Sequence, residues 1–252
     1  MNLKTKIKRI INKALKPIGF ELQRIKSSEK NLFRTPYPYL ENELVQYSNL
    51  EIKMERQVQG GPFEWPNIID LNNAVISLIG DEKRVVEIGC GTGFFAYHLA
   101  KGKEVEVVAT DIDPKVVAWA QEHRNLPNIT FLTREITPDD GPFDLVVGIE
   151  VIEHVKDYVG FLESCVELAQ KVILTSPNKG RDNNSYTQQP PNYPQHIREW
   201  TAGEFYWVLR CFYKSVNIYS IEEDYQTTEV VFPINILSAD TPVIAVCEDP
   251  IR

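Results

Sequence analysis

The sequence has few cysteines and no long apolar run. Its 252 residues include four cysteines, with no CxxC pair, each set in an apolar segment or a glycine-rich loop. This excludes a disulfide framework or a four-cysteine zinc site and indicates reduced, buried thiols, so we expect a cytoplasmic protein. No stretch approaches the roughly 18 apolar residues of a membrane span, and no apolar core of a signal peptide follows the basic N-terminus. We therefore expect neither a transmembrane helix nor a secretion signal.

Positive charge is also scarce outside the N-terminal segment. The formal net charge is -8, but residues 1–26 carry eight Lys or Arg and one Glu, which leaves -15 on the rest of the chain. Nucleic-acid affinity depends on Lys and Arg contacts to phosphates. The acidic body therefore argues against a nucleic-acid partner.

Two segments precede the main domain. In residues 1–26, apolar residues recur at helical spacing opposite the lysines, which predicts a basic amphipathic helix ended by Pro17 and Gly19. Two interpretations stay open: residues 1–16 make peripheral contact with an anionic membrane surface, or the helix packs on the protein or lies in solvent. Residues 27–66 are rich in Pro, Tyr and Asn and predict a cap or lid segment.

Residues 67–252 alternate short apolar runs with helical patterns. This alternation predicts an α/β domain with a doubly wound, mainly parallel sheet and helices on both faces. Helices are expected over 67–79, from Asp113-Pro114 onward, around 158–168, and from the capping box Thr201 to Glu204. The strands are expected at 85–88, 105–110, 129–132, 143–149, 171–175, 212–220 and 242–248.

The stretch VVEIGCGTGFFAYHLA, residues 85–100, is the most informative. A strand that runs through three glycines into a helix lets the backbone approach a ligand closely, and the helix N-terminus offers free N–H groups. The loop is expected to bind a nucleotide-like ligand through Gly89, Cys90, Gly91 and Gly93. The glycines alone also fit a dinucleotide fingerprint, so they do not choose between NAD and S-adenosylmethionine.

Acidic residues favour S-adenosylmethionine. Glu87 lies inside the first strand, where its carboxylate would repel a pyrophosphate but would attract a sulfonium ligand that carries an amino group. Asp111, at the end of the second strand, is placed to accept hydrogen bonds from a ribose diol. Glu135, after the third strand, is expected either to meet the adenine amino group or to be a solvated loop charge.

Four tracts resemble successive motifs of class I S-adenosylmethionine-dependent methyltransferases: VVEIGCGTG, TDID, FDLVVGIEVIEHV and VILTSPN, in order across residues 80–178. The resemblance implies a seven-stranded sheet whose last strand is antiparallel, with the cofactor at the carboxyl ends of the first strands. It also implies that the glycine loop holds the methionine end, Asp111 the ribose, and Ile112 one side of the adenine. Gly148, which ends the fourth strand, completes the expected cofactor-binding set. The connection 136–142 is too short for a usual crossover helix.

The tract Glu150-Val-Ile-Glu153-His154 follows the fourth strand. On a helical turn these two acids and the histidine would share one face, which suits either a hard divalent cation or a general base. The tract resembles the ubiquinone-biosynthesis O-methyltransferases and the small-RNA 3′-terminal 2′-O-methyltransferases, where it is implicated in magnesium-type metal binding. In the second group a later histidine precedes a sequence like EWTxxxF, and His196 has that position here. Glu150, Glu153, His154 and His196 are therefore candidate metal ligands, and the first three are candidate catalytic residues.

Several functions stay open. The favoured hypothesis is an enzyme that methylates an oxygen of a small-molecule, glycan or lipid-linked acceptor, with His154 taking the acceptor proton or a metal lowering the acceptor pKa. The aromatic residues of segments 33–66 and 186–200, including Tyr186, Tyr193 and Trp200, are expected either to contact the acceptor or to have an ordinary packing role. The alternatives are an RNA 3′-terminal 2′-O-methyltransferase, an NAD-dependent oxidoreductase, and a non-catalytic scaffold that binds S-adenosylmethionine.

Overall fold

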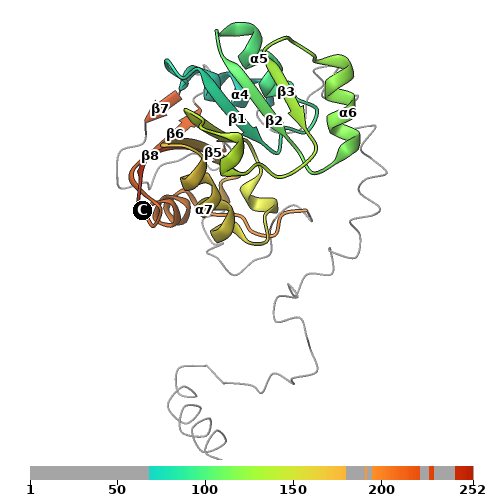
Figure 1. The fold of residues 1–252 in the computed structure, drawn as a ribbon. Coiled ribbons are helices and arrows are strands. Elements are labelled where there is room, and N and C mark those ends of the chain that lie inside the picture. Colours follow the sequence, from blue (N-terminus) through green and yellow to red (C-terminus); the bar gives the residue numbers. More distant parts are fainter. Residues whose placement is uncertain (1–67, 180–190, 192–194, 222–226, 230–241, 252) are drawn as a thin grey trace, which may run out of the picture. The chain divides into compact units, whose positions relative to one another are not determined.

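A computed structural model describes residues 68–179, 191, 195–221, 227–229 and 242–251 (Figure 1). The basic segment 1–26 and the cap segment 27–66 expected from the sequence lie outside the described residues, as do Tyr186 and Tyr193. Within the described part of the chain, no helix has both the length and the apolar character needed to cross a membrane.

One mixed sheet organises the described residues. Its strand order is β3-β2-β1-β4-β5-β8-β6-β7. The first five strands are parallel, and β8 runs antiparallel between β5 and β6. This confirms the expected seven-stranded sheet, and the unpredicted β7 adds an eighth strand at the edge. The strands are β1 Arg84–Ile88, β2 Glu106–Thr110, β3 Ile129–Leu132, β4 Leu145–Gly148, β5 Lys171–Ser176, β6 Tyr213–Ile221, β7 Thr227–Glu229 and β8 Val243–Pro250.

Helices cover both faces of the sheet. Side chains of α4 (Ile68–Ser77), α5 (Phe94–Gly102) and α6 (Pro114–His123) pack with Val85 and Val107 in one apolar cluster. Those of α7 (Tyr158–Leu168) and α8 (Ala202–Leu209) pack with Val86 and Val108 in a second cluster. Neighbouring strand residues thus enter opposite cores, as the two-residue period of a strand requires. The doubly wound arrangement can be followed in Figure 1, from the green α5 and α6 to the gold α7.

Side-chain caps start three of the helices, and two of these caps are the ones that the sequence predicts. The Asp113 side chain accepts a hydrogen bond from Lys115 N, and Thr201 forms a capping box with Glu204. Asp157 accepts from Gly160 N at the start of α7. Each such cap contributes about 1 kcal/mol to helix stability. The short connection 136–142 holds only one 3-10 turn, η3 (Pro138–Asp140), as its length predicts.

The cysteines follow the expected pattern with one exception. All four are free thiols, and Cys90, Cys165 and Cys247 are buried. Cys211 is exposed, so the expectation that it is buried was wrong. It follows α8 at the surface, where its thiol donates to the Trp207 carbonyl.

Candidate functional site

The candidate site lies at the carboxyl edge of the parallel strands. The glycine loop follows β1, Asp111 follows β2, and Glu150 follows β4 by two residues. Because β2, β1, β4 and β5 are neighbours in the sheet, the loops that leave their carboxyl ends meet at one edge. In open α/β sheets this edge is where ligands bind.

All three glycines of the loop have left-handed backbone angles, with φ of 72° at Gly89, 50° at Gly91 and 71° at Gly93. A Cβ built on Gly93 would lie 2.6 Å from the Phe131 ring, so tight packing demands glycine there. A Cβ on Gly91 would meet no described atom within 4 Å. Gly91 therefore faces the space in which a ligand could approach the backbone.

Gly89 joins the glycine loop to the acid and histidine residues. A Cβ built at this position would lie 2.5 Å from Cγ2 of Val151, the residue between Glu150 and Ile152. The loop after β1 and the turn after β4 are therefore in direct contact. Two sites predicted separately from the sequence form one continuous site.

Glu87 is buried in the sheet, with 4% of its surface exposed. It shares a strand face with Val85, and its Oε2 accepts a hydrogen bond of 3.2 Å from Ala96 N in the first turn of α5. Burial raises the pKa of Glu87 to about 8, while the Ala96 N–H and the positive charge of the buried Arg124 act in the opposite direction. Besides the ligand contact predicted for it, this acid ties β1 to the start of α5.

Asp111 fixes the shape of the loop. Its Oδ2 accepts from Gly91 N and its Oδ1 accepts from Asp113 N, both at 2.9 Å. Each carboxylate oxygen has a further lone pair, so Asp111 can still accept from a ligand hydroxyl. Ile112 is 74% exposed, and Glu135 is exposed beyond β3. These positions are compatible with the roles expected for both residues.

Gly148 and Trp200 have packing roles. A Cβ on Gly148 would lie 2.9 Å from Leu174 Cδ2, so this glycine leaves room for the Leu174 side chain of the neighbouring strand, and a cofactor contact stays a prediction. Trp200 is 1% exposed and packs with Phe205 and Tyr158. Trp200 therefore has the ordinary packing role that the sequence left open for it, because its ring is buried among apolar side chains.

The turn after β4 differs from the helical turn that the sequence argument assumed. The 3-10 helix η4 covers only Ile152–His154, and Glu150 precedes it with a left-handed φ of 53°. The assumption that Glu150, Glu153 and His154 share one helical face was therefore wrong. Glu150 turns instead toward β5, where the Thr175 hydroxyl accepts from Glu150 N at 2.9 Å and donates to its Oε1 at 2.8 Å.

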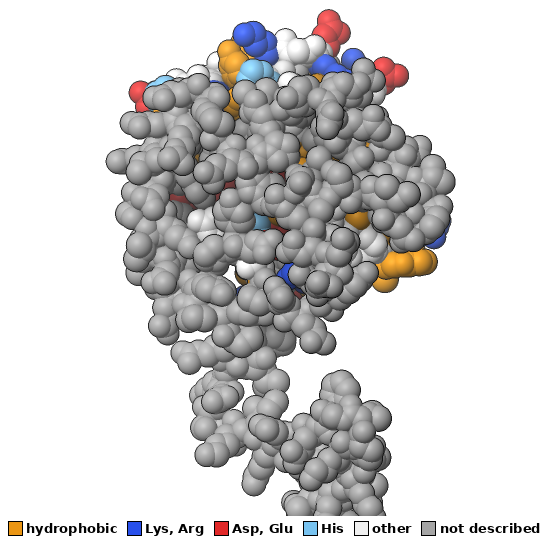
Figure 2. Space-filling view, turned by 180° about the vertical axis from the view of Figure 1, so that it is seen from behind, with side chains coloured by type: hydrophobic (Ala, Val, Ile, Leu, Met, Phe, Trp, Pro, Cys, Tyr) orange, Lys and Arg blue, Asp and Glu red, His pale blue; other side chains and the backbone are white. Residues whose placement is uncertain are grey.

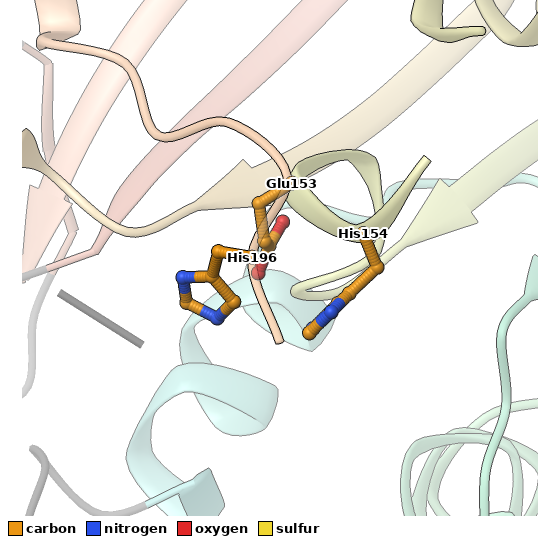
Figure 3. A group of neighbouring side chains, drawn as sticks. All are labelled: Glu153, His154 and His196. Atoms are coloured by element: carbon orange, nitrogen blue, oxygen red, sulfur yellow. The ribbon is translucent and has the colours of Figure 1, made fainter. Parts of the chain in front are cut away.

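Glu153, His154 and His196 form an acid–histidine cluster (Figure 3). One potential ligand atom from each lies within 4.8 Å of the others, and Figure 3 shows the Glu153 carboxylate between the two rings. The rings meet edge to face, with centroids 4.8 Å apart. Glu150 is not a member of this cluster, so three of the four candidate ligands come together.

Backbone contacts bring His196 to this cluster. The Glu153 carbonyl accepts from Ile197 N at 2.7 Å and from Arg198 N at 3.2 Å. A further backbone pairing joins Trp200 to Asn178, just after β5. The 195–200 segment is therefore held against η4, although more than 40 residues separate them in sequence.

The acids of the site are crowded in a buried region. Both carboxylate oxygens of Glu153 are buried without a hydrogen-bond partner among the described residues. Burial, with the charges of Glu150 and Glu199, raises the pKa of Glu153 well above its ordinary value. Burial also raises the pKa of Glu150, partly offset by the Thr175 hydroxyl. A proton or a cation is needed to balance these charges.

The sequence profile of the methyltransferase domain family matches residues 66–212, more than half of the chain. The chain belongs to the methyltransferase domain family. This confirms the resemblance noted from the four tracts. The matched region contains the glycine loop, the turn after β4 and His196, so the whole candidate site lies inside the methyltransferase domain.

Curated relatives and solved structures agree with this family. The chain is 33% identical over 90 residues to a ubiquinone biosynthesis O-methyltransferase of Cereibacter sphaeroides, covering 34% of this chain and 36% of the relative. It is 30% identical over 131 residues to a probable S-adenosylmethionine-dependent methyltransferase of Mycobacterium tuberculosis, covering 48% and 44%. The small RNA methyltransferase HEN1 has a similar fold, with a TM-score of 0.56 and 19% identity over 72% of this chain and 25% of that one. The matched segments thus span less than half of both curated relatives.

Two residues that support the site were not predicted from the sequence. Thr175 ends a buried strand, and nothing local distinguishes its hydroxyl from that of a core threonine. Glu199 lies three residues after His196 and bonds to its ring at 2.6 Å. The only sequence signal for Glu199 is its spacing of three residues from His196. This spacing does not indicate a role until the structure shows that residues 195–200 pack against η4.

Proposed function

We propose that this methyltransferase domain transfers a methyl group from S-adenosylmethionine to an acceptor oxygen. The observation that carries the proposal is the contact between Gly89 and Val151, which places the glycine loop directly beside the turn with the acid–histidine cluster. A donor loop and proton-accepting groups in contact are what a direct methyl transfer needs.

The residues at the glycine loop fit S-adenosylmethionine. No atom of the described residues lies within 4 Å of a Cβ built on Gly91, so a ligand can reach the backbone there, and the N-terminus of α5 is positive. Gly89, Cys90, Gly91 and Gly93 would hold the methionine portion, Glu87 its amino group, Asp111 the ribose, and Ile112 the adenine, with Glu135 and the Gly148 backbone as further contacts. When bound, the cofactor supplies a methyl group on a positively charged sulfur.

The acid–histidine cluster fits a divalent cation of the magnesium type. Glu153 brings two buried oxygens that have no hydrogen-bond partner in the described part of the chain, and His154 and His196 bring nitrogen donors within reach. Glu150 is outside this cluster, and its carboxylate accepts a hydrogen bond from the Thr175 hydroxyl. A bound cation would lower the pKa of an acceptor hydroxyl. His154 is the alternative, as a general base that takes the acceptor proton directly.

The acceptor we favour is a small-molecule, glycan or lipid-linked hydroxyl compound. One relative is named a ubiquinone biosynthesis O-methyltransferase, and the sequence of residues 1–16 has the composition of a peripheral membrane helix. We propose that the protein works in the cytoplasm, with residues 1–16 in contact with the membrane surface. Sedimentation with anionic liposomes, compared before and after removal of residues 1–18, tests the membrane contact.

Methylation of an RNA 3′-terminal ribose is the second candidate. His196 does join Glu153 and His154, as the resemblance to the small-RNA enzymes requires, and the fold is similar to that of HEN1. Two observations argue against RNA as the acceptor. The chain outside residues 1–26 carries a charge of -15, and the side chains coloured at the top of Figure 2 include both acidic and basic ones, so they form no basic patch there. Tight, salt-sensitive RNA retention in a filter-binding assay would reverse the ranking.

The deciding experiment is methyl transfer from isotopically labelled S-adenosylmethionine to polyprenyl phenols, glycans and short RNAs, with and without chelator. We expect transfer to a phenol or glycan hydroxyl, lost with chelator and restored by magnesium or manganese. Activity that survives chelator, with no magnesium, manganese or zinc binding by calorimetry, would leave His154 as the base. Cofactor binding without transfer to any acceptor would favour a scaffold.

A further inference from the structure

Glu199 is a buried acid that the proposed reaction does not use. It lies between the exposed Arg198 and the buried Trp200, and its side chain is 3% exposed. Its Oε1 lies 2.6 Å from Nδ1 of His196, whose side chain is 10% exposed. A contact this short between two shielded groups is a strong hydrogen bond.

The backbone around Glu199 is fixed at both ends. On one side, Ile197 N and Arg198 N donate to the Glu153 carbonyl. On the other side, the Trp200 carbonyl accepts from Lys179 N at 2.9 Å, and its ring is packed in the core. The Glu199 carboxylate is therefore held in place relative to the acid–histidine cluster.

The bond to Glu199 selects one form of His196. A carboxylate can only accept a hydrogen bond, so a neutral imidazole beside it carries its proton on Nδ1. The lone pair then lies on Nε2. His154 is arranged in the same way, because its Nδ1 lies 3.0 Å from the Gln195 carbonyl, which is also an acceptor only.

We infer that Glu199 is a positioning residue, which holds His196 in the Nδ1–H form so that Nε2 serves the acid–histidine cluster. Where it concerns cation binding, this inference rests on the proposed function. Outer carboxylates that orient a ligating histidine are worth about 10- to 100-fold in metal affinity. Glu199 accepts from Nδ1 of His196 as such an outer carboxylate, and the Gln195 backbone carbonyl is the corresponding acceptor for Nδ1 of His154.

The histidine tautomer can be measured directly. The chain has only four histidines, so two-bond ¹H–¹⁵N spectra of ¹⁵N-histidine-labelled protein at about pH 8.5, where free imidazole is neutral, resolve each ring. We expect His196 to be Nδ1–H in the unsubstituted protein and to shift toward Nε2–H in Glu199→Leu. In Glu199→Gln the amide can donate as well as accept, so a mixture of both forms is expected.

Glu204→Gln is the matched control. Glu204 stands on α8 outside the cluster and caps the helix through Thr201. The control is expected to lower thermal stability while leaving the His196 tautomer unchanged. If Glu199→Leu does not fold, Glu199→Gln, which keeps the side-chain shape, serves in its place.

Manganese affinity, measured by calorimetry, gives the second reading. We expect Glu199→Leu to bind manganese about 10- to 100-fold more weakly than the unsubstituted protein. Glu199→Gln should lose less affinity, because part of its His196 keeps the Nδ1–H form, and Glu204→Gln should bind manganese as well as the unsubstituted protein. His196 remaining wholly Nδ1–H in a folded Glu199 variant overturns the inference. Absence of manganese binding in the unsubstituted protein overturns the cation proposal alone, because the tautomer result still decides the role of Glu199.

Discussion

At the residue scale, the site depends on carboxylates placed where water is scarce. Glu87 lies in the sheet against α5, Glu150 lies beside β5, and Glu153 lies within η4. Each needs a compensating donor or charge, because an isolated buried carboxylate is costly. Oε2 of Glu87 and Oε1 of Glu150 already accept hydrogen bonds within the protein. Both oxygens of Glu153 have no partner among the described residues, so they are available to a ligand.

Glu87 gives a prediction about stability and pH. It takes up a proton near pH 4.5 in the unfolded chain and near pH 8 in the folded protein. Between these values the folded state binds the extra proton, so the free energy of unfolding falls as pH rises. The contribution is fully present below about pH 4.5 and is lost once pH passes about 8. Glu87→Gln should flatten this dependence in urea unfolding measured from pH 5 to 9, by up to a few kcal/mol.

The control for this prediction is Glu204→Gln, which removes an acid outside the site. It should retain the pH dependence of the unsubstituted protein. An equal slope in Glu87→Gln and the unsubstituted protein would contradict the prediction.

Thr175 gives a second prediction at this scale. Replacing Thr175 by Val keeps the shape but removes both hydrogen bonds to Glu150, whose left-handed backbone then loses its support. We expect Thr175→Val to lose about 1–3 kcal/mol of stability and at least about 10-fold in methyl transfer. Thr175→Ser, which retains the hydroxyl, should stay close to the unsubstituted protein in denaturant unfolding and activity. Equal loss in both variants would mean that packing, and not the hydroxyl, matters.

At the scale of elements, the glycine loop combines packing with ligand access. Gly93 packs against Phe131 of β3 and Gly89 against Val151, whereas Gly91 meets no described atom within 4 Å. The same residue type therefore serves two purposes within five positions. Substitution by alanine separates them.

Gly93→Ala and Gly91→Ala should behave differently. Both pay about 1–2 kcal/mol for a side chain in the left-handed region, but only Gly93→Ala adds overlap with the Phe131 ring. We expect Gly93→Ala to be destabilised by about 3 kcal/mol or more. Gly91→Ala should fold with a smaller loss, yet bind S-adenosylhomocysteine at least about 10-fold more weakly by calorimetry. Full binding by folded Gly91→Ala would show that the cofactor does not approach this position.

At the scale of the whole molecule, the site exists because the sheet gathers loops from distant parts of the sequence. Glu87 lies in β1, whereas Asp111, Glu153 and His196 come from the connections after β2, β4 and β5, and the order of these neighbouring strands brings the first three together. A cofactor bound across these loops contacts only the folded state. Its binding energy therefore appears as stability of the whole domain.

This linkage separates the methyl donor from NAD. At about 100 times its Kd, S-adenosylmethionine should raise the free energy of unfolding by about 2.7 kcal/mol. NAD should give no gain, and S-adenosylmethionine at the same concentration should raise the free energy of unfolding of Gly91→Ala by about 1.4 kcal/mol or less, because that variant binds it at least about 10-fold more weakly. Thermal unfolding with each ligand makes the comparison. Stabilisation by NAD alone would return the chain to the oxidoreductase alternative.

The sheet and its helices follow from local pattern. Apolar runs of strand length, the caps at Asp113 and Thr201, and the glycine loop each act over a few residues, so the sequence by itself determined the fold class and the position of the donor loop. The three-residue β7 was missed, because its pairing with β6 depends on a neighbour rather than on its own pattern.

The acid–histidine cluster was decided only by the tertiary structure. Motif spacing selected Glu150, Glu153, His154 and His196, but the left-handed backbone at Glu150 turns its carboxylate toward Thr175 and leaves three residues together. The docking of residues 195–200 on the Glu153 carbonyl brings Glu199 to His196. Such contacts join residues far apart in the chain, and their geometry depends on packing and buried hydrogen bonds that no local pattern encodes.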